Sequence, residues 1–133
     1  MVKLILETSN LIDYLAEDHN IDFNHLVIRE KVKELYQECE SDISKIKKAY
    51  EFVRDEIAHS WDIGSTRITK RASEVLVYKE GICYAKSNLF AALLRAVNIP
   101  TGFCYQRLTI GNAPETGYCI HALNAVYLSE FHK

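Results

Sequence analysis

Two residues of this chain have the types and the spacing for nucleophilic acyl chemistry, Cys83 and His121. A cysteine thiolate attacks acyl carbons, and an imidazole within hydrogen-bond reach takes up and returns the proton. The two residues stand 38 positions apart (121 minus 83). A helix, the residues that end it and one strand fill that distance. A second strand that carries His121 can therefore run back past the start of the helix.

The stretch after Gly81 predicts one long helix whose first turn lies at or just after Cys83. Its apolar residues recur at spacings of three and four: Leu89, Ala92, Leu93, Ala96 and Val97. Asn98 can adopt the left-handed conformation that ends a helix, and Pro100 cannot continue one. At the helix start, unpaired backbone N–H groups and the helix dipole favour a thiolate. The N–H of Cys83 would also face a developing oxyanion.

After Pro100 the pattern changes from helical to alternating, which predicts a strand from Phe103 to Ile110. A turn-rich connection follows at residues 111–117. A second alternating run, from about Cys119 to Leu128, carries His121. These runs predict an antiparallel hairpin beside the Cys83 helix.

The first half of the chain predicts two helices. One spans residues 27–39, and the other begins at a capping Ser41 or Asp42 and runs to about Ile57. The expected core face of the second helix is Ile43, Ile46, Tyr50, Val53 and Ile57. His59 is expected at the end of this helix, and residues 72–77 are expected to form a short apolar turn. Residues 1–25 carry little pattern, although Leu4–Leu6 suggests an edge strand and residues 10–16 a helical turn or extended chain.

Composition narrows the function classes. Apolar residues make up 48% of the 133 residues and charged residues 26%, which is ordinary for one globular domain and wrong for a disordered chain. The net charge of −2, from 16 basic and 18 acidic residues, argues against a nucleic-acid surface. No apolar run approaches the roughly 20 residues that span a bilayer, and no signal peptide is recognised. We therefore expect a cytoplasmic protein with reduced cysteines, no membrane partner and no cofactor.

Several segments together resemble the transglutaminase-like superfamily: Phe52–Ile57, Ala72–Leu76, Gly81–Pro100 and His121–Leu128. The resemblance implies an α+β, papain-like core, in which N-terminal helices and a central helix starting at the catalytic cysteine pack on a small antiparallel sheet. It also implies acyl transfer through a thioester, to an amine or to water, with a peptide or protein as substrate. Matched by position, Cys83 is the nucleophile and His121 the general base and acid.

The chain departs from the family pattern at two places. The family usually has an aromatic residue where Leu123 stands, and its third catalytic member is an aspartate on a strand that would follow Lys133. Residues 1–133 are therefore expected to form a single domain that lacks its last strand. Without the orienting carboxylate such a chain can fold and be nearly inactive. Its open sheet edge would favour a homo-oligomer.

Two other functions stay open from the sequence. The same fold can serve as a non-catalytic module that binds a peptide or protein. Alternatively, Cys83, Cys104, Cys119 and His121 match the ligand types of a structural zinc site, although no closely spaced ligand pair supports one. A lone cysteine at a helix start is also commonly just a small buried residue.

Overall fold

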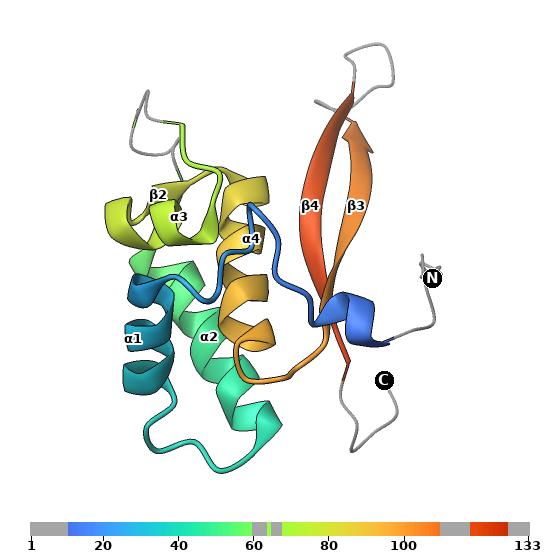
Figure 1. Ribbon diagram of the computed structural model, residues 1–133. Helices are drawn as coiled ribbons and strands as arrows, with labels where there is room; N and C mark the ends of the chain where they lie inside the picture. The colour runs from blue at the N-terminus through green and yellow to red at the C-terminus, as the bar shows by residue number, and fades with distance from the viewer. Residues whose placement is uncertain (1–10, 60–63, 65–67, 110–117, 128–133) are drawn as a thin grey trace.

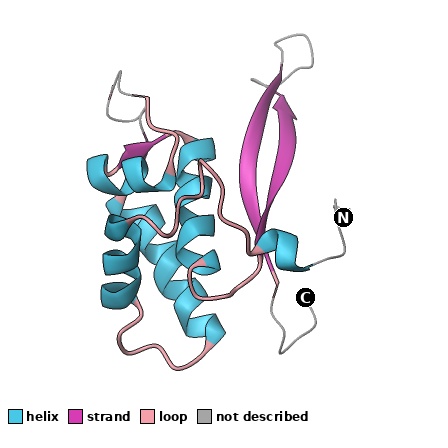
Figure 2. Cartoon of the chain, viewed as in Figure 1, coloured by secondary structure: helices cyan, strands magenta, loops and turns pink. Residues whose placement is uncertain are grey.

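The computed structural model describes residues 11–59, 64, 68–109 and 118–127. In chain order, the elements are η1 (Leu11–Tyr14), α1 (Leu26–Leu35), α2 (Asp42–Glu56), β1 (Ala58–His59), α3 (Ala72–Tyr78), β2 (Glu80–Gly81), α4 (Cys83–Arg95), β3 (Thr101–Thr109) and β4 (Tyr118–Val126). The α-helices gather on one side of the molecule, and the β3–β4 hairpin stands on the other with η1 beside its base (Figure 1, Figure 2). The expected α+β class is therefore confirmed.

Helix α4 lies at the centre, between the other α-helices and the hairpin (Figure 1). Its apolar side chains are excluded from water on almost every side, and Leu89, Leu93 and Leu94 are each 0% exposed. Leu89, Ala92 and Leu93 of the predicted stripe therefore lie in the core of the fold, whereas Ala96 and Val97 follow the end of α4 and are half-buried. None of the helices in the described part of the chain combines the length and apolar character needed to cross a bilayer.

The end of α4 follows the predicted stop signals. Asn98 adopts the left-handed conformation (φ 63°), and the Ile99 N–H returns to the Leu94 carbonyl at 3.0 Å. The chain then enters β3 at Thr101. Arg95, buried in the last turn of α4, donates from Nε to the Thr101 carbonyl at 2.9 Å and from Nη1 to the Ala16 carbonyl at 2.7 Å. One guanidinium therefore joins α4, the start of β3 and the N-terminal segment.

Burial explains the electrostatic state of this guanidinium. Removal from water lowers the pKa of Arg95, and the negative charge of Asp18 acts in the opposite direction. The guanidinium carbon also lies 5.9 Å from the centre of the Phe103 ring, close enough for a cation–π contact. These neighbours partly replace the water that a buried charge loses.

The predicted antiparallel hairpin is present. Its register runs from Thr101 opposite Val126 to Thr109 opposite Tyr118. One further bond, from the Tyr127 N–H to the Pro100 carbonyl at 3.0 Å, extends the pairing at the end of the hairpin nearest the C-terminus of α4. The structure therefore places both predicted strands within about two residues of their expected bounds.

A second, parallel pair of strands corrects the expectation for His59. Ile57 leaves the helical conformation (φ −109°, ψ 112°), and the Ala58 N–H bonds the Lys79 carbonyl at 2.9 Å. β1 and β2 then pair, with His59 opposite Gly81. His59 is thus part of a strand and does not end a helix, because its neighbours' hydrogen bonds are made to a distant segment.

Helices α1 and α2 agree with prediction in position and differ in detail. α1 ends at Leu35, short of the predicted residue 39. Ser41 caps α2 as predicted, through a reciprocal pair of bonds with Ser44. The buried face of α2 is rotated in part from the predicted one. Val53 and the following Ile57 are buried as predicted and Ile46 is half-buried, whereas Ile43 and Tyr50 are exposed and Ala49 and Phe52 are buried instead.

The rotation of α2 has a physical reason in side-chain size and polarity. Ala49 is 0% exposed, and its small side chain permits a close approach to the core. Tyr50 instead stays at the surface, where its hydroxyl is hydrated and the Arg54 guanidinium lies 5.5 Å from its ring centre. The other parts of the N-terminal prediction are mixed. Residues 11–14 form a 3₁₀ turn, and Leu4–Leu6 lies outside the described residues.

A buried tyrosine links α1 to α4 and can be tested directly. The Tyr36 hydroxyl donates to the Leu93 carbonyl at 2.8 Å. Tyr36→Phe removes the donor and leaves the carbonyl buried, so we expect a loss of about 1–2 kcal/mol in the free energy of unfolding. Tyr50→Phe, at an exposed tyrosine, is the matched control and should change little. Equal urea midpoints for the two variants would contradict the assignment.

The same bond predicts a pH dependence. Burial, with a smaller contribution from Cys39, raises the pKa of the Tyr36 phenol above its usual range. The unfolded chain therefore ionises this group first, and the stability it contributes is present below pH ~10 and lost as the pH rises further. The stability difference between the parent and Tyr36→Phe should shrink in urea titrations above that pH. A constant difference would contradict it.

Candidate active site

Cys83 is the first residue of α4, as predicted, and its side chain is half-buried. Ile82 precedes it with extended backbone (φ −78°, ψ 174°), and the Lys86 N–H bonds the Ile82 carbonyl at 2.9 Å. The first N–H groups of a helix have no partner within it, so the thiol lies beside the open, positive end of α4. An anion forming next to this thiol would meet donors that are already oriented.

The segment before Cys83 is held from two sides. On one side β2 pairs with β1, and on the other Thr69 Oγ1 donates to the Glu80 carbonyl at 2.8 Å. Gly81 has no room for a side chain: a Cβ there would lie 3.0 Å from Ala85 Cβ and 3.1 Å from Thr69 Oγ1. The glycine therefore permits β2 to lie close to Thr69 and to Ala85 of α4.

A second side chain anchors the segment that contains Thr69. Asn88, 2% exposed on α4, donates from Nδ2 to the Lys70 carbonyl at 2.8 Å. Sequence reasoning missed both Thr69 and Asn88, since neither belongs to a recognisable motif. Their partners are backbone carbonyls 11 and 18 positions away, which no local pattern indicates.

Strand β4 is docked on α4 by Asn124. Its Nδ2 donates to the Ser87 carbonyl at 3.2 Å and to the Gly102 carbonyl at 3.3 Å. α4 and β4 run in the same direction, because the C-terminal ends of both lie near Pro100, just before β3 begins. Cys83 therefore lies about 6 Å before Ser87 along the helix, toward the same end as the strand residues that precede Asn124.

The backbone of His121 lies on this strand, opposite Gln106. It precedes Asn124 by three residues, about 10 Å along the strand, toward the Cys83 end of α4. The fold thus carries both predicted residues to one end of the molecule. The side chain of His121 lies outside the described residues, so the contact between the imidazole and the Cys83 thiol stays a prediction.

The hairpin register separates two members of the alternative zinc set. Cys104 pairs with Leu123, whereas Cys119 pairs with Leu108, four residues farther along β3. Four residues of strand span about 14 Å, which is too far for two thiolates on one tetrahedral ion. Among the residues whose side chains are described, no three histidine, cysteine, aspartate or glutamate residues gather to hold a metal.

The described histidines away from β4 have other roles. His25 Nδ1 accepts from the Val27 N–H at 3.3 Å and so caps α1. His19 accepts a hydrogen bond from Arg71 Nε at 3.1 Å, near the start of α3. His59 is different, because β1 places it opposite Gly81, two residues before Cys83.

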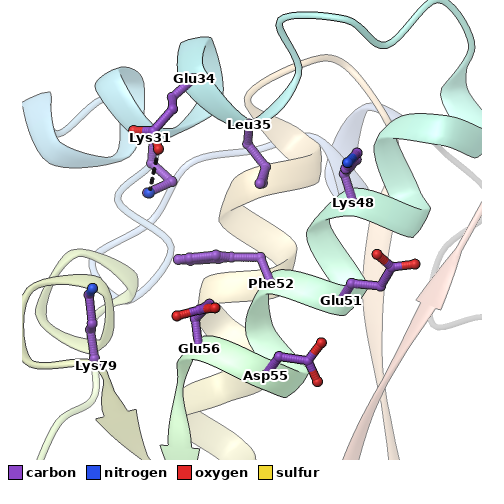
Figure 3. A pocket seen from close by; sticks show the side chains of 9 residues that line it. All are labelled: Lys31, Glu34, Leu35, Lys48, Glu51, Phe52, Asp55, Glu56 and Lys79. Carbon is purple, nitrogen blue, oxygen red and sulfur yellow. Dashed lines mark hydrogen bonds and ion pairs between the residues drawn. The ribbon is translucent and has the colours of Figure 1, made fainter.

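A shallow hollow of about 400 Å³ lies elsewhere, between α1, α2 and Lys79. Figure 3 shows its lining, in which charged side chains of both signs surround Phe52. Lys31 lies 4.8 Å from the centre of the Phe52 ring and forms an ion pair with Glu34 at 3.3 Å. Cys83 is not among the lining residues, so this hollow is separate from the candidate site.

The docking of β4 can be tested with two asparagines of matched chemistry. Asn124→Leu removes both donors to Ser87 and Gly102, so we expect faster hydrogen exchange in β4 and a loss of about 1–2 kcal/mol in unfolding free energy. Asn88→Leu should instead speed exchange around Lys70 and leave β4 protected. Hydrogen exchange read by mass spectrometry distinguishes the two variants. Unchanged exchange of β4 in Asn124→Leu would show that other contacts hold the strand.

Comparison with known proteins agrees with this geometry. The fold is similar to a solved structure of a "putative cysteine protease" from Cytophaga hutchinsonii, with a TM-score of 0.72 and 18% sequence identity. The match covers 92% of this chain and 39% of the other, so this chain spans less than half of that protein. The curated proteins include no match. Residues 29–132 match the family described as the transglutaminase-like superfamily. The chain therefore belongs to the transglutaminase-like superfamily.

Proposed function

We propose that this protein is a cysteine-dependent hydrolase or acyltransferase that acts on peptide or protein amides through a thioester, with Cys83 as nucleophile and His121 as general base and acid. The observation that carries the proposal is the position of the Cys83 thiol, half-buried at the open end of α4 and at the end toward which β4 carries His121. Family membership supports the same chemistry.

The proposed reaction has two balanced steps. In the first, the His121 imidazole takes the thiol proton, and Cys83 Sγ forms a bond to the amide carbon. The C–N bond then breaks, and the leaving amine takes the proton from the imidazolium. In the second, water loses a proton to the imidazole and forms a bond to the thioester carbon. The C–S bond then breaks, the acid is released, and the imidazolium proton returns to the Cys83 sulfur. An amine in place of water would give transfer instead of hydrolysis.

The open end of α4 contributes to both steps. Each step passes through a tetrahedral carbon with a negative oxygen, and N–H groups oriented before the reaction stabilise that charge without reorganising. Removal of one such donor typically costs about 10²–10³ in rate. The bonds that hold Glu80 and Gly81 therefore matter to the chemistry, because they determine where these N–H groups point. We propose water as the acceptor, since no residue of the sequence identifies an amine site.

One observation favours a second function, a non-catalytic module that binds a peptide or protein on the same fold. The family usually has an aromatic residue two positions after the catalytic histidine, and here it is Leu123. On this alternative, Cys83 would be an ordinary thiol at a helix start. The reactivity of the thiol separates the two functions.

The alkylation rate of each cysteine with iodoacetamide, mapped by mass spectrometry at pH 7, tests the proposal. We expect Cys83 to react at least about tenfold faster than Cys39, because a helix start and a neighbouring imidazolium both favour the thiolate. His121→Ala should remove most of that advantage. The matched control is His25→Ala, which changes a histidine that caps α1 and should leave the Cys83 rate unchanged.

Two outcomes would overturn the proposed pair. If Cys83 reacts no faster than Cys39, which is also half-buried, the binding module becomes the better description. If Cys83 is fast but His121→Ala has no effect, the helix end alone activates the thiol and His121 has another role.

A further inference from the structure

Large exposed apolar side chains gather at the end of the molecule where α4 begins. In the described residues, eight such side chains are exposed, and four of them belong to the segments directly before, after or beside β2: Ile68, Val77, Tyr78 and Ile82. The other four are dispersed over η1, α1 and α2: Ile12, Leu26, Ile43 and Tyr50. Single exposed apolar residues are normal on protein surfaces, whereas a group of them usually marks a binding surface. We call Ile68, Val77, Tyr78 and Ile82 the β2 patch.

The chain path brings the patch together. Val77 and Tyr78 end α3, and Lys79, in the left-handed conformation (φ 54°), turns the chain directly into β2. Ile82 follows β2 and is 39% exposed. The backbone at Ile68 lies beside β2, because its neighbour Thr69 bonds the Glu80 carbonyl at 2.8 Å, and the Ile68 side chain is 90% exposed. Figure 1 shows α3, β2 and the start of α4 at one end of the molecule.

The patch adjoins the proposed nucleophile. Ile82 immediately precedes Cys83, and consecutive Cα atoms lie about 3.8 Å apart. A carbonyl carbon under attack must come within about 3–3.5 Å of the Cys83 sulfur. The side chain next to that carbonyl therefore lies within reach of Ile82. The exposed Lys70 and Lys79 and the half-buried Glu80 flank the patch, so charges of both signs border its apolar part.

We infer that the β2 patch selects the substrate, by binding an apolar side chain on the residue that supplies the reacting carbonyl. This inference rests on the proposed function and adds a substrate class to it: peptides in which a leucine-like side chain stands on the acyl side of the amide. Burying that side chain against Ile82 and Ile68 removes apolar surface of both partners from water, which favours binding.

Chloromethyl ketones of acetylleucine and acetylglycine test the inference, because they carry the same reactive group and differ in the side chain beside the carbonyl. Their alkylation rates at Cys83 are each divided by the rate with iodoacetamide. We expect the leucine probe to exceed the glycine probe by about tenfold, as apolar contacts of this size typically discriminate. Ile82→Gln and Ile68→Gln should each lower that ratio, and Ile82→Leu should retain it.

Ile43→Gln is the matched control. Ile43 is 44% exposed, close to the 39% of Ile82. It lies in the first turn of α2, whereas the end of α2 that leads into β1, and so to β2, is the other one. The leucine-to-glycine ratio should be unchanged in this variant. Glutamine keeps the side chain long and, unlike serine, is not a preferred cap at the position before a helix.

Three results would overturn the inference: a parental ratio near one, a ratio that neither Ile82→Gln nor Ile68→Gln lowers, or an acetylglutamate probe that reacts fastest. The last result would assign selection to the flanking lysines. A separate measurement would show that the proposed function has failed: the alkylation rate of Cys83 with iodoacetamide would then be no greater than that of Cys39. The probe ratio remains measurable in that case, because each rate is normalised to the reactivity of the same thiol.

Discussion

The burial of α4 is the constraint on which the rest of the structure depends. From Ser87 to Arg95 every residue of this helix is buried, so its surface must be covered on all sides. Three helices cover one side and a two-stranded hairpin covers the other. A two-stranded hairpin alone is marginally stable, so β3 and β4 depend on α4 as much as α4 depends on them. The start of the helix, at the exposed Ile82 and the half-buried Cys83, is where this covering ends.

Polar side chains position the covering elements. Tyr36, Asn88, Arg95 and Asn124 each donate to a backbone carbonyl of a distant segment. An apolar contact tolerates sliding, whereas a hydrogen bond to one carbonyl holds one register, and an unpaired buried group is costly. The apolar core therefore supplies the stability, and these bonds determine how each element is aligned along α4. The alignment of β4 matters most for the proposed function, because it determines how far the backbone of His121 lies from Cys83.

Local patterns predicted much of this architecture. The helix that starts at Cys83, its stop at Asn98 and Pro100, the Ser41 cap and the antiparallel hairpin all follow from signals within a few residues of each other. Periodicity was less reliable for the orientation of α2, because the spacing of Ile43 and Tyr50 matches a buried face about as well as that of Ala49 and Phe52. The choice between the two faces depends on which side chains fit against α4.

The sequence by itself determined the family, the two residues proposed to do the chemistry and the order of the elements that carry them, since these depend on residue type and short spacing. Only the tertiary structure decided the β1–β2 pairing, the anchors at Thr69, Asn88 and Asn124, and the gathering of the β2 patch beside Cys83. Each of these joins residues far apart in the chain through one or two hydrogen bonds or a single close approach. Such contacts leave no periodic signal, because they form only once the burial of α4 has brought the segments together.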